Sequence, residues 1–132
     1  AARKPLWDSL SQQSIAGFRD GGGILIGETM AFQLSVRPGD QISLLSAKGR
    51  TTAFGSVPTR RTYKIAGLFK VGMHEYDSSF VFMPLSAAQS FFTLPGAVTG
   101  IELYSSSPLQ IERVSAAVKA RLGQSYRLFD WQ

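Results

Sequence analysis

Residues 41–69, QISLLSAKGRTTAFGSVPTRRTYKIAGLF, are the part of the sequence from which the fold of this chain is most clearly predicted. Apolar side chains alternate with polar ones at both of its ends. Ile42 and Leu44 occupy alternate positions in the first run, and Tyr63 and Ile65 do so in the second. A period of two is typical of strands with one buried face. The sequence therefore predicts a strand at each end of this stretch.

The residues that join these two runs, 47–61, have the composition of an exposed loop. They include two glycines, one proline and several hydroxyl side chains. Phe54 and Val57 are large apolar residues among these polar and small ones. We therefore expect a long loop between two strands, that is, a projecting hairpin with an aromatic residue near its tip.

The positive charge of the chain is concentrated around this loop. The segment between Asp40 and Glu75 contains no acidic residue, whereas the remaining eight basic residues of the chain are balanced by nine acidic ones. A concentration of charge of this kind permits nucleic acid, an anionic membrane surface or an acidic protein as the partner. The six basic residues of the segment are Lys48, Arg50, Arg60, Arg61, Lys64 and Lys70.

The overall composition is that of one folded domain or of two small subdomains with a shared core. The chain has 132 residues, of which 44% are apolar, and it has no cysteine, which excludes disulfides, thiol catalysis and thiolate metal sites. No apolar run approaches the roughly 20 residues of a membrane-spanning helix, and no signal peptide is recognisable. Because the chain begins Ala1-Ala2, we expect a single-domain fragment covering 1–132.

The other segments alternate between helical and extended patterns, which predicts an α+β fold. We expect helices over 6–18, 84–92 and from Ser107-Pro108 to Leu122, and strands over 24–26, 79–83, 100–104 and 126–129, with a loop over 71–77 and with 29–34 ambiguous. The β-rich part is expected over about 23–84, and the α/β part over about 85–132.

Three patterns resemble catalytic or metal sites, and each has a simpler explanation. Gly22 and Gly27 have the spacing of a phosphate-binding loop, but Glu28 stands where that motif requires lysine. His74, Glu75 and Asp77 offer ligands from one segment only, so we expect a polar turn in which Asp77 and Ser78 bond local amides. No Gly-x-Ser-x-Gly motif is present. We therefore expect no enzyme, metal or cofactor.

The basic loop fits protein docking better than nucleic-acid binding. Nucleic-acid surfaces usually spread Lys and Arg along a face and interleave them with aromatics, whereas Arg60 and Arg61 are adjacent. Phe54 and Val57 provide apolar anchors with a basic rim, which is the pattern of a protein interface. A solvated loop without a partner is the other alternative that the composition leaves open.

Several segments, in the same order along the chain, resemble the LolC/LolE family, the membrane subunits of the ABC transporter that releases lipoproteins from the inner membrane of Gram-negative bacteria. The motif from Gly72 to Ser79 and the ending Asp130-Trp131 are the more specific ones, whereas the opening resembles the wider MacB/FtsX-like group. The similar segments are 23–27, 34–44, 49–58, 65–79, 83–85 with 88–89, 98–102 and 130–131.

The resemblance implies a periplasmic domain with a porter-like α/β part and a mostly β subdomain called Sabre. In the LolC type, a β-hairpin called the Hook, at the position of residues 47–61, captures the periplasmic carrier LolA with the help of a basic pad. Arg60 and Arg61 fall at the pad. The residues that the resemblance places at the carrier are Arg50, Thr52, Ala53, Phe54, Gly55, Val57, Pro58, Arg60 and Arg61.

The implied partners are the LolA-like carrier, the lipoprotein substrate, a second transmembrane subunit and a cytoplasmic ATPase, with no nucleic acid. The implied location is the periplasmic face of the inner membrane. The motif GMHEYDSS resembles the LolE or a hybrid type, so the subunit type stays open. The alternatives are a MacB/FtsX-like domain for efflux or mechanical signalling, and a basic nucleic-acid-binding domain.

Overall fold

The computed structural model describes residues 8–53, 55–103, 111–123 and 126–129, and of residues 47–52 and 56 the main chain alone. The chain divides into two compact units. One consists of residues 3–100, and the other of residues 1–2 with 101–132. Helices and a four-stranded mixed sheet confirm the predicted α+β class. The Sabre-like and porter-like parts, with their expected boundaries, stay a prediction.

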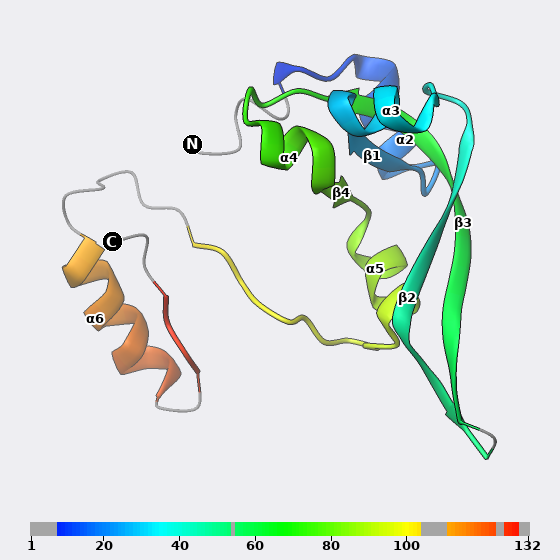
Figure 1. The fold of residues 1–132 in the computed structure, drawn as a ribbon. Helices are drawn as coiled ribbons and strands as arrows, with labels where there is room; N and C mark the ends of the chain where they lie inside the picture. The colour runs from blue at the N-terminus through cyan, green and yellow to red at the C-terminus, as the bar shows by residue number, and fades with distance from the viewer. Residues whose placement is uncertain (1–7, 54, 104–110, 124–125, 130–132) are drawn as a thin grey trace. The chain divides into compact units, whose positions relative to one another are not determined.

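The sheet of residues 3–100 has the strand order β2-β3-β1-β4. Its strands are β1 (Ile24–Gly27), β2 (Gln41–Thr52), β3 (Gly55–Phe69) and β4 (Val81–Phe82). The central pair, β1 and β3, runs parallel, whereas β2 against β3 and β4 against β1 run antiparallel. Figure 1 shows β2 and β3 extending together well beyond the other elements of this unit.

Strand β1 forms the centre of the core, and all four of its residues are buried. Ile24 and Ile26 pack with Ile65 on one side of the sheet, and Leu25 packs with Phe69 on the other. Successive side chains of a strand point to opposite faces, so an uninterrupted apolar run is required where both faces are covered. The expected strand at 24–26 is confirmed.

One helix covers each face of β1. Helix α2 (Gln12–Arg19) contributes Phe18 to the cluster around Leu25, and helix α3 (Glu28–Leu34) contributes Met30 to the cluster around Ile24. The hydroxyl of Ser11 caps α2 by accepting a bond from the Ser14 amide at 3.1 Å. The segment 29–34, ambiguous in the sequence, is therefore helical because one of its faces lies on the core.

The β2–β3 hairpin is longer than the sequence predicted. Residues 41–46 pair with 64–59, and after a shift in register residues 50–52 pair with 57–55. Much of the expected loop 47–61 is therefore strand, and that part of the prediction was wrong. The β-branched residues at 51, 52, 57 and 59 favour an extended chain. Gly55, with φ +118°, adopts a conformation that other residues avoid and so allows a short turn.

The segment after β3 contains a helix that the sequence did not predict. Helix α4 (His74–Ser79) replaces the last part of the expected loop 71–77, and of the expected strand 79–83 only β4 pairs with β1. The hydroxyl of Ser78 donates to the carbonyl of His74 at 2.6 Å, one turn earlier in this helix. Helix α5 (Leu85–Phe92) begins after Pro84, as predicted.

The second unit contains helix α6 (Ile111–Leu122), which confirms the predicted helix. It ends at Gly123, where φ is +70° and the amide donates to the carbonyl of Lys119 at 3.0 Å. The expected cap at Ser107 and Pro108 lies outside the described residues. The strands expected at 100–104 and 126–129 are not found, since the described residues of these two segments have no regular secondary structure.

Candidate partner-docking site

Most of the residues predicted to meet a partner lie along the β2–β3 hairpin. Arg50 and Thr52 belong to β2, and Ala53 stands at the turn. Gly55, Val57, Pro58, Arg60 and Arg61 follow along β3. Phe54 lies outside the described residues. The hairpin therefore gathers the predicted residues on one element, and Figure 1 shows the end of this element away from β1 and its helices.

The hairpin consists of two paired sections with an interruption between them. Ser46 pairs with Thr59 and Arg50 pairs with Val57, so three residues of β2 stand opposite Pro58 alone. Proline has no amide hydrogen to donate to a ladder, which explains why pairing is interrupted at this point. We call residues 41–46 with 59–64 the inner section, and 50–52 with 55–57 the outer section.

Arg60 and Arg61 leave β3 on opposite faces, because side chains alternate along a strand. The guanidinium of Arg60 lies 3.4 Å from the hydroxyl of Ser43, which in turn bonds the hydroxyl of Thr62 at 2.9 Å. Arg61 shares its face with Tyr63, two residues along. The two arginines predicted as one pad are therefore divided between the two faces of the hairpin.

A groove with a volume of about 460 Å³ lies between β3 and the end of α5. Residues 57–61 form one side of it, and Ser90 and Thr93 form the other. Helix α5 is held here by an edge-to-face contact between Phe91 and Tyr63, whose ring centroids are 6.3 Å apart. No pattern in the sequence indicated Ser90 or Thr93, since their proximity to β3 arises only when α5 folds back onto the hairpin.

The carboxylate of Asp77 is buried, and its partners explain its role. Its two oxygens accept bonds from the amides of Val71 and Gly72 at 2.9 and 3.1 Å. The expected bonds from Asp77 to local amides are therefore confirmed, whereas Ser78 bonds a carbonyl instead. Asp77 thus fixes the turn between β3 and α4. Among the described residues, no group of three or more His, Cys, Asp or Glu is placed to hold a metal ion.

The glycine-rich turn before α3 has a structural explanation. Glu28 at the start of α3 pairs with Lys70 at the end of β3, with 3.2 Å between the charged atoms. A Cβ added at Gly27 would lie 2.0 Å from the carbonyl oxygen of Asp77, so the glycine is required for the close approach of α4. The glycine spacing that resembles a phosphate-binding loop therefore reflects the close packing of α4 against Gly27.

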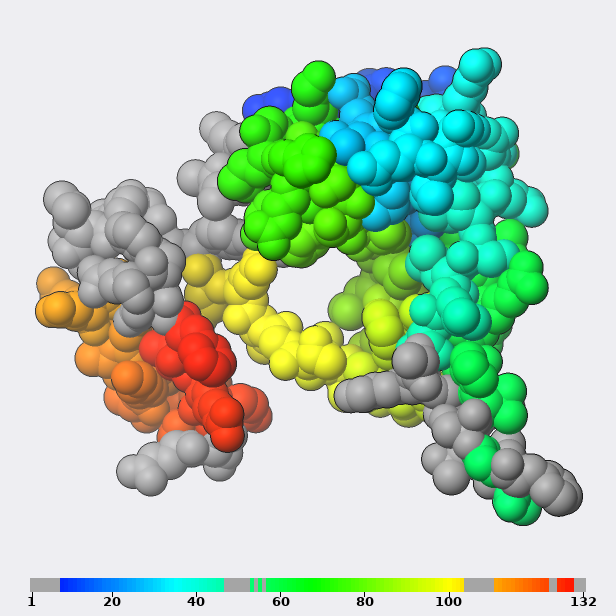
Figure 2. Space-filling model, viewed as in Figure 1, coloured from blue at the N-terminus to red at the C-terminus, as the bar shows by residue number. Residues whose placement is uncertain are grey.

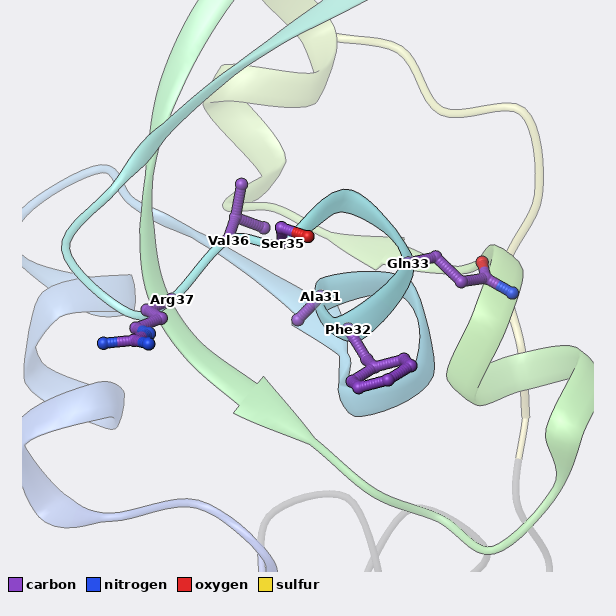
Figure 3. Close-up of a pocket in the computed structure, with 6 residues that line it drawn as sticks. All are labelled: Ala31, Phe32, Gln33, Ser35, Val36 and Arg37. Carbon is purple, nitrogen blue, oxygen red and sulfur yellow. The ribbon is translucent and has the colours of Figure 1, made fainter.

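A second hollow, of about 520 Å³, lies where α3 ends. Ala31 is buried at its base, while Phe32 is 86% exposed. Figure 3 shows the side chains of Phe32, Gln33 and Arg37 pointing in different directions, so no polar groups converge on a bound molecule. We therefore assign no binding role to this hollow.

Apolar side chains are also exposed along α4, which adjoins α3 in Figure 2. Met73, Tyr76 and Phe80 are 53%, 39% and 39% exposed and follow helical spacing. The rings of Tyr76 and Phe80 stack with centroids 4.2 Å apart, so they shield each other in part. None of these residues belongs to the hairpin or the groove.

Within the part of the chain that the structure describes, no helix has the length and apolar character needed to cross a membrane.

Comparison with known proteins shows relatives of one kind. No protein-family model matches the chain. It is 30% identical over 108 residues to the lipoprotein-releasing system transmembrane protein LolC of Xylella fastidiosa, which covers 82% of the chain and 26% of that protein. It is 26% identical over 123 residues to LolE of Haemophilus influenzae, which covers 92% of the chain and 29% of that protein. A LolC of Neisseria meningitidis is 25% identical over 95 residues, or 72% of the chain.

The chain spans about a quarter of the length of these curated relatives. Their names describe transmembrane proteins of a release system and no enzymatic activity, in agreement with the class expected from the sequence. Both LolC and LolE are matched, so the subunit type stays open. The chain is therefore, over most of its own length, a homologue of the LolC and LolE lipoprotein-releasing system transmembrane proteins, which confirms the resemblance found in its sequence.

Proposed function

We propose that this chain is a non-enzymatic periplasmic domain of a lipoprotein-releasing ABC transporter subunit. Its β2–β3 hairpin docks a LolA-like carrier, to which the transporter hands over outer-membrane lipoproteins. The domain works at the periplasmic face of the Gram-negative inner membrane, beside a second transmembrane subunit, while a cytoplasmic ATPase supplies the energy.

The observation that carries this proposal is the exposed end of the hairpin. Val57 is 57% exposed there, and Arg60 and Arg61 are exposed on the two faces below it. Among the described residues neither arginine forms an ion pair. An apolar residue that becomes buried on binding supplies affinity, while unpaired charges around it raise the association rate and orient the partner.

A binding measurement with a purified LolA-like carrier tests this proposal. The chain is immobilised and carrier binding is followed by surface plasmon resonance. We expect Phe54→Ala and Val57→Asp to weaken binding by tenfold or more, because each removes an apolar anchor, which corresponds to about 1.4 kcal/mol or more.

Phe32→Ala is the matched control, because it makes the same substitution at an exposed phenylalanine of α3, outside the hairpin. Its carrier affinity should equal that of the wild type. The absence of carrier binding by the wild type, or an equal loss in the hairpin and control variants, would remove the docking role of the hairpin.

A further inference from the structure

The unit that contains residues 101–132 exposes large apolar side chains to solvent. None of the residues that the structure describes between 101 and 129 is buried, those of helix α6 included. Apolar surface gathered on one small unit marks a contact with a partner or with a membrane. The exposed side chains, with their exposed fractions, are Ile101 (80%), Leu103 (60%), Leu122 (49%), Tyr126 (66%) and Phe129 (84%).

Helix α6 carries an apolar stripe along one side. The stripe consists of Ile111, Val114, Val118 and Leu122, which follow one another at intervals of three or four residues. This spacing places all four side chains on one face of a helix. The first three are half-buried and the last is exposed, so the stripe is covered only in part.

Basic residues border the stripe on both sides. Because a helix has 3.6 residues per turn, Lys119 falls beside Leu122 on one side of the stripe, and Arg121 falls beside Val118 on the other. Both basic side chains are exposed, and among the described residues neither forms an ion pair. Long basic side chains in such positions can rest their carbon stems on apolar surface while their charged ends reach outward.

We infer that α6 lies along the surface of an anionic phospholipid membrane. Its apolar stripe enters the boundary between headgroups and acyl chains, and Lys119 and Arg121 donate hydrogen bonds to lipid phosphates on the two sides. The inference rests on the proposed function, which puts the domain beside a membrane. It adds a contact separate from the hairpin, which belongs to the other unit.

The charge of α6 favours a lipid surface over a protein partner. The helix has three basic residues and one acidic residue, and anionic lipids attract basic segments. The cores of protein interfaces are depleted of lysine, whereas basic residues beside an apolar stripe are typical of helices at membrane surfaces. With 12 residues, α6 offers a small contact area. A membrane-anchored protein holds its domain at a high local concentration, so a modest affinity is sufficient.

Vesicle binding by the whole chain tests the inference. The chain is sedimented with vesicles of phosphatidylcholine and phosphatidylglycerol in equal parts, and with vesicles of phosphatidylcholine alone. We expect clearly stronger binding to the mixed vesicles. Changing both Lys119→Glu and Arg121→Glu should weaken that binding about thirtyfold or more, since each cation near an anionic surface contributes about fivefold.

The matched control is the double variant Arg19→Glu with Arg37→Glu. It makes the same change in net charge at two exposed residues of the other unit, and Arg19, like Arg121, lies in the last turn of its helix. Its binding to the mixed vesicles should stay close to that of the wild type. Circular dichroism checks that both double variants keep their helix content.

A fluorescent label reports which face of α6 meets the lipid. Because the chain has no cysteine, one introduced cysteine carries the label alone. An NBD group on Leu122→Cys, at the stripe, should shift its emission to the blue on mixed vesicles. The same group on Ala120→Cys, on the opposite side of the helix, should not.

The outcomes separate this inference from the proposed function. Equal binding to the two kinds of vesicle, equal losses in the two double variants, or equal shifts from the two labels would overturn the inference. If the chain binds the carrier but no vesicles, the membrane contact of α6 fails while hairpin docking stands. If α6 binds vesicles and the chain does not bind the carrier, the membrane contact stands and the docking of the carrier fails.

Discussion

Gly27 at the end of β1 lies directly against the main chain of Asp77 in α4. A Cβ at position 27 would come within 2.0 Å of the carbonyl oxygen of Asp77 and within 2.6 Å of its Cα. These atoms belong to the backbone, so a side-chain rotation cannot make room. The contact joins the central strand to the helix that follows β3.

We therefore expect Gly27→Ala to lower the free energy of unfolding by at least the 1–3 kcal/mol that is typical of an overpacked core. Urea denaturation followed by circular dichroism measures the change. Gly100→Ala is the control, since nothing lies within 4 Å of a Cβ there, and it should change stability by less than about 0.5 kcal/mol. Equal stability of the two variants would contradict the contact.

Replacing Asp77 by asparagine should destabilise the turn between β3 and α4. The two carboxylate oxygens of Asp77 accept two amide bonds, whereas asparagine has a single acceptor oxygen. One partly buried amide then loses its partner, which costs about 1–3 kcal/mol. Thermal or urea unfolding measures the loss, and Glu75→Gln, on the exposed side of α4, is the control. If Asp77→Asn unfolds like the control, the two bonds contribute nothing.

Phe91 should be essential for the position of α5, whereas its neighbour Phe92 should not. Phe91 is 4% exposed and contacts Tyr63, while Phe92 is 53% exposed. Phe91→Ala is expected to cost about 3–5 kcal/mol, and Phe92→Ala under about 1 kcal/mol. Because Phe91 holds α5 against β3, Phe91→Ala should also shift the amide signal of Ser90 in the ¹⁵N NMR spectrum. An unchanged Ser90 signal would show that α5 is held by other contacts.

The outer section of the hairpin should be dispensable for folding. Replacing residues 48–57 by Asn-Gly, a pair that favours a two-residue hairpin turn, retains the inner section and removes the outer one. We expect the urea midpoint to change little and carrier binding to be lost, because the core residues that the structure describes as buried lie outside the deleted segment. A large loss of stability would mean that the outer section supports the core.

Local patterns predicted the parts of the fold that depend on near neighbours in the sequence. The alternation of Ile42 and Leu44 predicted β2, and the spacing of Ile111, Val114 and Val118 predicted α6, because each element exposes one side to its surroundings. Helix α4 escaped prediction because it has only six residues, and because the turn before it depends on the amide bonds of Asp77.

For the candidate site, the sequence showed which residues carry charge but not how these residues are arranged in space. The charge around Arg60 and Arg61 is visible in the sequence, but their division between two faces requires the register of β3 against β2. Ser90 and Thr93 stand about thirty residues further along and reach the hairpin through tertiary packing alone. Strand length was underestimated because glycine and proline within 47–61 resemble loop residues, although pairing continues on both sides of Pro58.

The interruption opposite Pro58 has a mechanical consequence. A partner that pulls on the turn applies force first to the three backbone pairs of residues 50–52 with 57–55. Pairs in a hairpin open one after another from the loaded end, so these three separate before the force reaches the six inner pairs of residues 41–46. The interruption therefore divides unzipping from the turn into two steps, and the first step leaves the inner section in place, together with the core around Ile24, Leu25 and Ile26.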